Sequence, residues 1–210
     1  MRLRWRPGAV VGLALAAALA ACSRSERAPQ AGVERRASVP ASPRVVPHGR
    51  PIPKGGGTYK LGQPYEIDGQ WYTPREEPGY DRRGLASYYG GEFHGRRTAN
   101  GEIFDMWALS AAHPTLPLPS YVYVTNLDNG RTLLLRVNDR GPYVNSRLID
   151  VSRAAARYLG FEREGTAPVR VRYAGRAPLS GDDRKEQRFL ASQPWFRVAL
   201  SHHPAGYGGR

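Results

Sequence analysis

Two β-type runs joined by a turn signal constrain the fold of this chain more than any other feature. Residues 121–126 alternate aromatic and β-branched side chains, and residues 131–137 form a largely apolar run. Between them lies Asn129-Gly130, a pair that favours the tight turns of β-hairpins. The second run stops at Asn138-Asp139-Arg140, followed by a Gly-Pro pair that ends a strand. The sequence therefore predicts a hairpin that holds Asp139 at the end of a strand.

The remaining patterns predict a small, mainly β domain. Residues 85–89 and 169–173 are further candidates for short strands. Ser152, an alanine-rich run and Gly160 are typical of the start, body and end of one short helix. Several short strands with one or two short helices indicate a small closed barrel. We expect this barrel domain to cover residues 84–179.

Composition divides the rest of the chain after the first 21 residues into three parts. Residues 22–57 are rich in Pro, Arg, Ala, Ser and Gly. They hold too few apolar side chains to offset the entropy of ordering, so we expect a disordered, flexible tether. Residues 58–83 carry aromatic side chains around an Asp68-Gly69 turn signal, and we expect an extended segment or hairpin that packs on the barrel. Residues 180–210 are expected to form a short C-terminal tail with a helix-compatible piece at residues 182–191.

Residues 1–21 have the features of an export signal. Three arginines among the first six residues precede an apolar run at residues 9–21, which is too short to span a bilayer stably. The run ends in Leu19-Ala20-Ala21-Cys22, and Cys22 is the only cysteine in the chain, so it cannot form an internal disulfide. The pattern resembles a bacterial lipobox, which implies lipid attachment at Cys22. The alternative is an ordinary secretory signal with an incidental cysteine.

By the same resemblance, Ser23 after Cys22 favours the outer membrane, with the protein facing the periplasm. The whole chain has a net charge of +13, and removal of residues 1–21 leaves +10. A basic surface suits a polyanion, either nucleic acid, an anionic membrane or an acidic cell-wall polymer. For an exported chain without a nucleic-acid-binding motif, we expect no nucleic-acid partner. No phosphate loop, dinucleotide fingerprint or metal-ligand spacing appears, so we expect neither a cofactor nor a metal.

Four ionisable side chains are candidates for chemistry: Glu102, Asp105, His113 and Asp139. Taken singly, each has an ordinary structural explanation, such as an aspartate that caps a turn or a hydrogen-bonded histidine. If His113 meets Asp139 across the fold, the pair suits acid–base chemistry. An arginine at bonding distance would keep Asp139 ionised. Adjacent side chains of a strand face opposite ways, so Arg140 is expected to point elsewhere.

Six segments resemble the rare lipoprotein A (RlpA) family, in order and at uninterrupted spacing. They are residues 86–90, 93–102, 108–113, 124–130, 137–142 and 150–152. The resemblance implies a six-stranded double-psi β-barrel. For characterised members it implies a lytic transglycosylase that cleaves the β-1,4 bond between MurNAc and GlcNAc in peptidoglycan. Such an enzyme prefers strands without stem peptides and leaves 1,6-anhydroMurNAc ends.

The resemblance also implies roles for individual residues. Asp139 matches the catalytic carboxylate and His113 its partner. The residues expected to contact the substrate are Glu102, Asp105, Tyr89, His94 and Arg140. For Tyr89 a place in the barrel core is equally compatible, and for His94 a structural role in its loop. The expected partners are peptidoglycan glycan strands and, through lipid on Cys22, a membrane; we expect a monomer.

One carboxylate suffices for this chemistry because the reaction uses no water. The C6 hydroxyl of the sugar attacks C1, so a single group can act first as acid and then as base, whereas a hydrolase normally needs two carboxylates. Two other interpretations remain open, a non-catalytic peptidoglycan-binding or expansin-like lipoprotein and an envelope scaffold. Many family members carry a C-terminal glycan-binding domain that the short tail here does not match, so septal targeting is not predicted.

Overall fold

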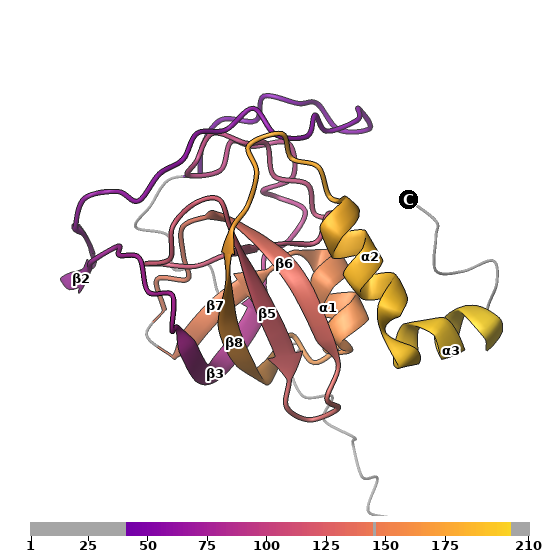
Figure 1. Cartoon of the computed structure of the whole chain (residues 1–210). Helices are drawn as coiled ribbons and strands as arrows, with labels where there is room; N and C mark the ends of the chain where they lie inside the picture. The colour runs from indigo at the N-terminus through magenta and orange to yellow at the C-terminus, as the bar shows by residue number, and fades with distance from the viewer. Residues whose placement is uncertain (1–40, 145, 203–210) are drawn as a thin grey trace, which may run out of the picture.

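A closed six-stranded β-barrel forms the body of the computed structural model, which describes residues 41–144 and 146–202 (Figure 1). Around the barrel the order is β3 (Asp81–Tyr88), β7 (Arg147–Val151), β4 (Ser110–Ala112), β6 (Thr132–Asp139), β5 (Ser120–Asn126) and β8 (Thr166–Arg176). The pairs β3–β7 and β4–β6 are parallel, and the other pairs are antiparallel. The predicted mainly β barrel is confirmed. The predicted export signal and Cys22 lie outside the described residues.

The barrel interior is filled by the alternate residues of its strands. Along the β5–β6 hairpin, Val122 pairs with Leu135 and Val124 with Leu133, and all four side chains are fully buried. This is the period of two that places every second side chain on the inner face. Other members of the same core cluster are Val137, Ile149, Val151, Val169 and Val171. The barrel is therefore packed with side chains, and chemistry must take place at its rim.

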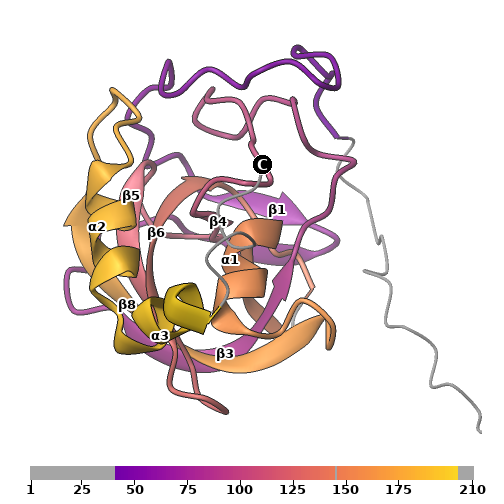
Figure 2. The same cartoon turned by 90° about the vertical axis from the view of Figure 1, so that its right-hand side faces the viewer.

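Three helices lie outside the barrel in the described part of the chain (Figure 2). They are α1 (Arg153–Leu159), α2 (Arg184–Ser192) and α3 (Pro194–His202). Ser152 and Gly160 cap α1 as their sequence positions predict. The tail thus contributes two helices, and Leu190 and Phe196 join the main core cluster. None of the helices in residues 41–144 and 146–202 has the length and hydropathy to cross a membrane.

An N-terminal strap, residues 41–60, runs over one end of the barrel as the indigo segment of Figure 1. The backbone N–H groups of Val45 and Val46 donate to the carbonyl of Gly95 at 2.9 and 3.0 Å. A side chain at Gly57 would clash, because an added Cβ would lie 2.8 Å from side-chain atoms of Asn100 and Glu102. Most of the strap was predicted to be part of a flexible tether, because its composition offers few apolar side chains to bury. The strap is held instead by backbone hydrogen bonds and by close packing at glycine, which composition does not reveal.

A small hairpin follows the strap. It consists of β1 (Tyr65–Ile67) and β2 (Gln70–Tyr72), joined by Asp68 and Gly69 with φ of 50° and 79°. The rings of Tyr65 and Tyr72 stack with centroids 5.3 Å apart. The Tyr65 hydroxyl donates to the carbonyl of Pro114 at 2.7 Å, which ties the hairpin to the barrel.

Replacing Ser152, the N-cap of α1, tests how much its two hydrogen bonds stabilise the fold. The Ser152 hydroxyl accepts from the N–H of Ala155 and donates to the carbonyl of Ala108, and its side chain is fully buried. We expect Ser152→Ala to lower the free energy of unfolding by about 1–2 kcal/mol in urea titrations, since both partners lose a hydrogen bond. The exposed Ser146 provides the control, and Ser146→Ala should leave stability unchanged. Equal stability of both variants would contradict this account.

Candidate active site

Asp139 ends strand β6 with its carboxyl held in place and half-buried. Its Oδ1 atom accepts from the backbone N–H of Ala99 and of Arg140, each at 2.8 Å. Within the described residues Oδ2 makes no hydrogen bond, which leaves it to a ligand. Burial raises the pKa of Asp139 to about 6, although both N–H groups and the charges of Arg140 and Lys60 act in the opposite direction. A carboxylic acid with this pKa can donate a proton near neutral pH.

Arg140 does not pair with Asp139 through its guanidinium. The guanidinium donates instead to three backbone carbonyls, those of Leu116 at 2.6 Å, Leu61 at 2.7 Å and His113 at 3.1 Å. The side chain therefore points away from the Asp139 carboxyl, as strand alternation predicts. Arg140 holds the surrounding loops together through these three hydrogen bonds, which engage both of its Nη atoms, and this placement does not favour the predicted substrate contact.

His113 lies next to Asp139 in the barrel, but its ring is turned away. Strands β4 and β6 run in parallel here, and the backbone N–H of His113 donates to the backbone carbonyl of Asp139 at 3.0 Å. The ring is 1 % exposed. Its Nδ1 atom accepts from the N–H of Thr115 and of Leu116 at 3.2 and 3.1 Å, and Nε2 lies 2.8 Å from the Tyr80 hydroxyl.

These contacts determine what the His113 ring can do. Two N–H groups aimed at Nδ1 leave the proton on Nε2, which donates to Tyr80. Burial, reinforced by the charge of Arg140, lowers the pKa of His113 to about 3. The ring is therefore neutral and out of reach of a saccharide. The predicted meeting of the two side chains is not seen, and His113 instead contacts Asp139 through its backbone N–H.

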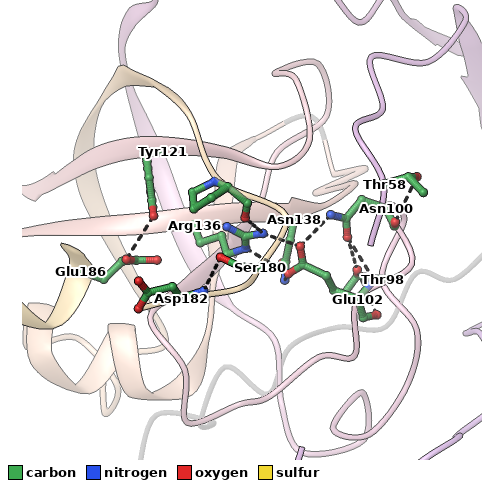
Figure 3. A network of polar contacts seen from close by, with 11 residues as sticks. Thr58, Thr98, Asn100, Glu102, Tyr121, Arg136, Asn138, Ser180, Asp182 and Glu186 are labelled. Carbon is green, nitrogen blue, oxygen red and sulfur yellow. Dashed lines mark hydrogen bonds and ion pairs between the residues drawn. The ribbon is translucent and has the colours of Figure 1, made fainter. Parts of the chain in front are cut away.

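Glu102 is the centre of a buried polar network (Figure 3). Its carboxylate accepts from Arg136 at 2.6 and 3.0 Å, from Asn138 at 3.0 Å and from Asn100 at 2.9 Å. Burial raises the pKa of Glu102, but these hydrogen bonds outweigh it and the net pKa is lowered. Glu102 is only 4 % exposed. The predicted sugar contact is therefore not favoured, because the carboxylate is enclosed by its own partners.

The other predicted contacts divide into two groups. His94 and Asp105 come together, with Nδ1 and Oδ1 3.6 Å apart, and both are half-buried. Within residues 41–144 and 146–202 neither makes a hydrogen bond or ion pair with Asp139. Tyr89 is 7 % exposed and stacks on Phe104 at 4.2 Å, so its ring belongs to a core cluster and cannot serve as a surface platform.

Asp150 is a carboxylate that sequence patterns did not single out as a site residue. Ala112 of β4 lies opposite both Asp139 on β6 and Asp150 on β7, so the three side chains share one face. Asp150 accepts from the Ser87 hydroxyl at 2.6 Å, lies 3.3 Å from Arg147, and burial raises its pKa. Asp150 lies within β7, directly after Leu148 and Ile149, and a carboxylate inside such an apolar strand was the available signal. In the described part of the chain no three His, Cys, Asp or Glu side chains are grouped to hold a metal ion.

Comparison with known proteins connects this geometry to a family. A family model described as lytic transglycolase (DPBB_1) matches residues 81–171. The endolytic peptidoglycan transglycosylase RlpA of Pseudomonas aeruginosa is 50 % identical over 127 residues, which are 60 % of this chain and 37 % of that protein. The protein of the same name from Neisseria meningitidis is 54 % identical over 108 residues, covering 51 % of this chain and 45 % of its own length. The chain spans less than half the length of these two relatives.

Solved structures show a weaker likeness. A Streptomyces papain inhibitor covers 48 % of this chain and is itself covered to 99 %, with 24 % identity and a TM-score of 0.40. An expansin from Clavibacter michiganensis covers 47 % of this chain and is covered to 52 %, with 19 % identity and a TM-score of 0.37. At these scores the likeness adds nothing to the fold described above.

Breaking the central ion pair tests the support beneath Asp139. We expect Glu102→Gln to lower the free energy of unfolding by about 3–5 kcal/mol, because it leaves the buried charge of Arg136 without its counter-charge. Urea titration measures the change. The exposed pair Arg153–Glu162, 2.7 Å apart, provides the matched control, and Glu162→Gln should cost less than about 1 kcal/mol. Similar losses in both variants would show that the Glu102 pair is not desolvated.

The raised pKa of Asp139 predicts a stability gain on its replacement. A carboxyl whose folded pKa of about 6 exceeds its unfolded value destabilises the fold as pH rises from about 4 to about 6. We expect Asp139→Asn to raise the free energy of unfolding by about 3 kcal/mol at pH 7, since the pKa rises from 3.8 to about 6, and to have little effect at pH 4. Urea titrations at the two pH values measure this. Asp128→Asn, at an exposed loop position, serves as control; a gain from Asp139→Asn that does not depend on pH would contradict the assignment.

Proposed function

Since this chain belongs to the RlpA family of lytic transglycosylases through the barrel of residues 81–171, we propose that it cleaves peptidoglycan glycan strands. The bond is the β-1,4 link from MurNAc C1 to GlcNAc O4, and the product carries a 1,6-anhydroMurNAc end. The preferred strands are those without stem peptides. The observation that carries the proposal is the Asp139 carboxyl, held through one oxygen at the barrel rim with its pKa raised to about 6.

Asp139 serves as acid and then as base. In its protonated form it gives its proton to the glycosidic oxygen as the bond from C1 to that oxygen breaks. The resulting carboxylate then takes the proton of the C6 hydroxyl as that oxygen bonds to C1. The proton count balances without water, so no second carboxylate is needed to activate a water molecule. The two N–H groups on Oδ1 keep the carboxyl in one orientation through both steps.

The neighbouring residues position this one group. The N–H of His113 holds the Asp139 backbone, and the Glu102 network holds the loop that carries Ala99. Tyr65, Tyr72 and Tyr143 form a cluster of half-buried rings. The cluster lies close to Asp139, whose charge raises the pKa of Tyr65 and of Tyr143. Aromatic faces suit the apolar faces of pyranose rings, so we assign this cluster to sugar stacking.

We infer the location of the protein from its first residues. The lipobox-like Leu19-Ala20-Ala21-Cys22 supports a lipid anchor at Cys22 and placement on the outer membrane, facing the periplasm. The net charge of +10 after removal of residues 1–21 suits the acidic polymers of the envelope. In this arrangement the barrel reaches the glycan layer from the membrane on residues that follow Cys22.

The decisive experiment is digestion of amidase-treated sacculi with detection of anhydro-ended fragments by mass spectrometry. We expect Asp139→Asn to lower the rate about a hundred- to ten-thousand-fold, as loss of a general acid does. For the unmodified protein, kcat/KM should fall as pH rises through about 6, because Asp139 of the free protein must be protonated to donate.

Two outcomes would overturn the proposal. Asp128→Asn removes an exposed loop carboxylate and should retain full activity. Full activity of Asp139→Asn as well would mean that another group supplies the proton. Binding of the sacculi without anhydro-ended products, by the unmodified protein at any pH, would favour the alternative of a non-catalytic glycan-binding barrel.

A further inference from the structure

Lys60 lies beside the Asp139 carboxyl on a rigid backbone. Its N–H donates to the Leu118 carbonyl at 2.7 Å, and its own carbonyl accepts from the Leu118 N–H at 2.9 Å. On either side of it, the Thr58 N–H donates to Asn100 and the Leu61 carbonyl accepts from Arg140. The backbone at this point of the strap is therefore bonded to the barrel on both sides. The Cα atom of Lys60 is therefore held in a fixed position relative to Asp139.

The Lys60 ammonium and the Asp139 carboxyl approach the same residue. The Nζ atom lies 3.1 Å from the Ala99 carbonyl, and the Ala99 N–H lies 2.8 Å from Asp139 Oδ1. Lys60 is exposed, and in the described part of the chain no carboxylate lies within ion-pair distance of its Nζ. A carbonyl neutralises no charge, so this ammonium retains its capacity for an anion.

The other two lysines are already engaged. Lys54 pairs with Asp183 at 2.8 Å, and Lys185 lies 4.4 Å above the Tyr121 ring. Arg140, the other cation acting on Asp139, has both of its Nη atoms on backbone carbonyls. Lys60 is thus the cation near the candidate acid that is both accessible and without a counter-charge among residues 41–144 and 146–202.

The substrate proposed above carries a matching anion. Each MurNAc ring bears a lactyl group on O3, and its carboxyl is an amide when a stem peptide is attached. Removal of the peptide frees the carboxylate on the same ring whose C1 bond is cleaved. A free carboxylate therefore appears next to the scissile bond in naked strands and is absent from peptide-bearing ones.

We propose that Lys60 is a specificity residue that binds the free lactyl carboxylate of MurNAc, and that this contact underlies a preference for naked glycan. The inference rests on the proposed function, because it names the group recognised at the same site. The Lys60 ammonium would donate a charge-assisted hydrogen bond to the lactyl carboxylate, and no covalent bond changes. Since the pair would be exposed, its contribution is modest and falls with salt.

The test compares two substrates of equal length. One is amidase-treated glycan with free carboxylates, and the other is the same glycan with its carboxylates coupled to methylamine, which makes them neutral amides. For the unmodified protein we expect the KM to be about five-fold higher on the neutral strands at low salt, with similar kcat. Lys60→Met should have the same KM on both substrates, and Lys60→Arg should keep the difference.

Lys54→Met is the matched control, because it removes a lysine of the same strap whose charge is already paired. It should discriminate between the substrates like the unmodified protein. A second readout separates recognition from structural damage. The charge of Lys60 lowers the pKa of Asp139, so in Lys60→Met the falling limb of the pH profile should move to higher pH. A Lys60→Met variant that discriminates like the unmodified protein would overturn the proposal.

A binding experiment with an inactive variant tests the lysine inference separately from the proposed function. Asp139→Asn protein, with and without Lys60→Met, is sedimented with each glycan. If the unmodified protein cleaves neither substrate, the proposed function fails, while carboxylate-dependent binding that is lost in Lys60→Met still supports the lysine site. If cleavage occurs but neither binding nor KM depends on the carboxylate, the lysine inference fails alone.

Discussion

The buried ion pair between Glu102 and Arg136 is the interaction on which the site depends. Arg136 lies on β6, three residues before Asp139, and Glu102 lies in the loop that carries Ala99. The pair draws this loop against the end of β6, where the Ala99 N–H meets the Asp139 carboxyl. The strap closes over the same loop, since Gly57 packs against Asn100 and Glu102. A buried charge pair therefore sets the orientation of the carboxyl that we propose as the acid.

The pKa values of two carboxyl groups at the site are shifted in opposite directions. Glu102 receives hydrogen bonds to both oxygens, and its pKa is lowered, so it stays ionised and structural. Asp139 receives two N–H groups on one oxygen only, and burial raises its pKa. Buried surroundings thus go with a lowered pKa at Glu102, where hydrogen bonds reach both oxygens, and with a raised pKa at Asp139, where they reach one. The raised pKa of Asp139 lowers the stability of the folded protein at neutral pH, as is common at functional sites.

Several features of the site were predictable, and the failures share a physical cause. Strand alternation at β5 and β6 predicted the hairpin, the strand end at Asp139 and the direction of Arg140. The roles of Tyr89 and Glu102 depended on burial, which arises from packing between distant segments. The His113 ring is turned by N–H groups of its own loop and by Tyr80, and no spacing in the sequence reports such an orientation.

By itself the sequence determined the local structure of this protein. Alternating apolar residues, the Ser152 and Gly160 caps and the Gly-Pro stop after Arg140 act through near neighbours, so they are readable along the chain. The tertiary structure alone decided which polar groups face one another. Burial and electrostatic contact depend on segments far apart in sequence, as when residues 58–60 and 98–102 meet the end of β6. That meeting places one ammonium and one raised-pKa carboxyl beside Ala99.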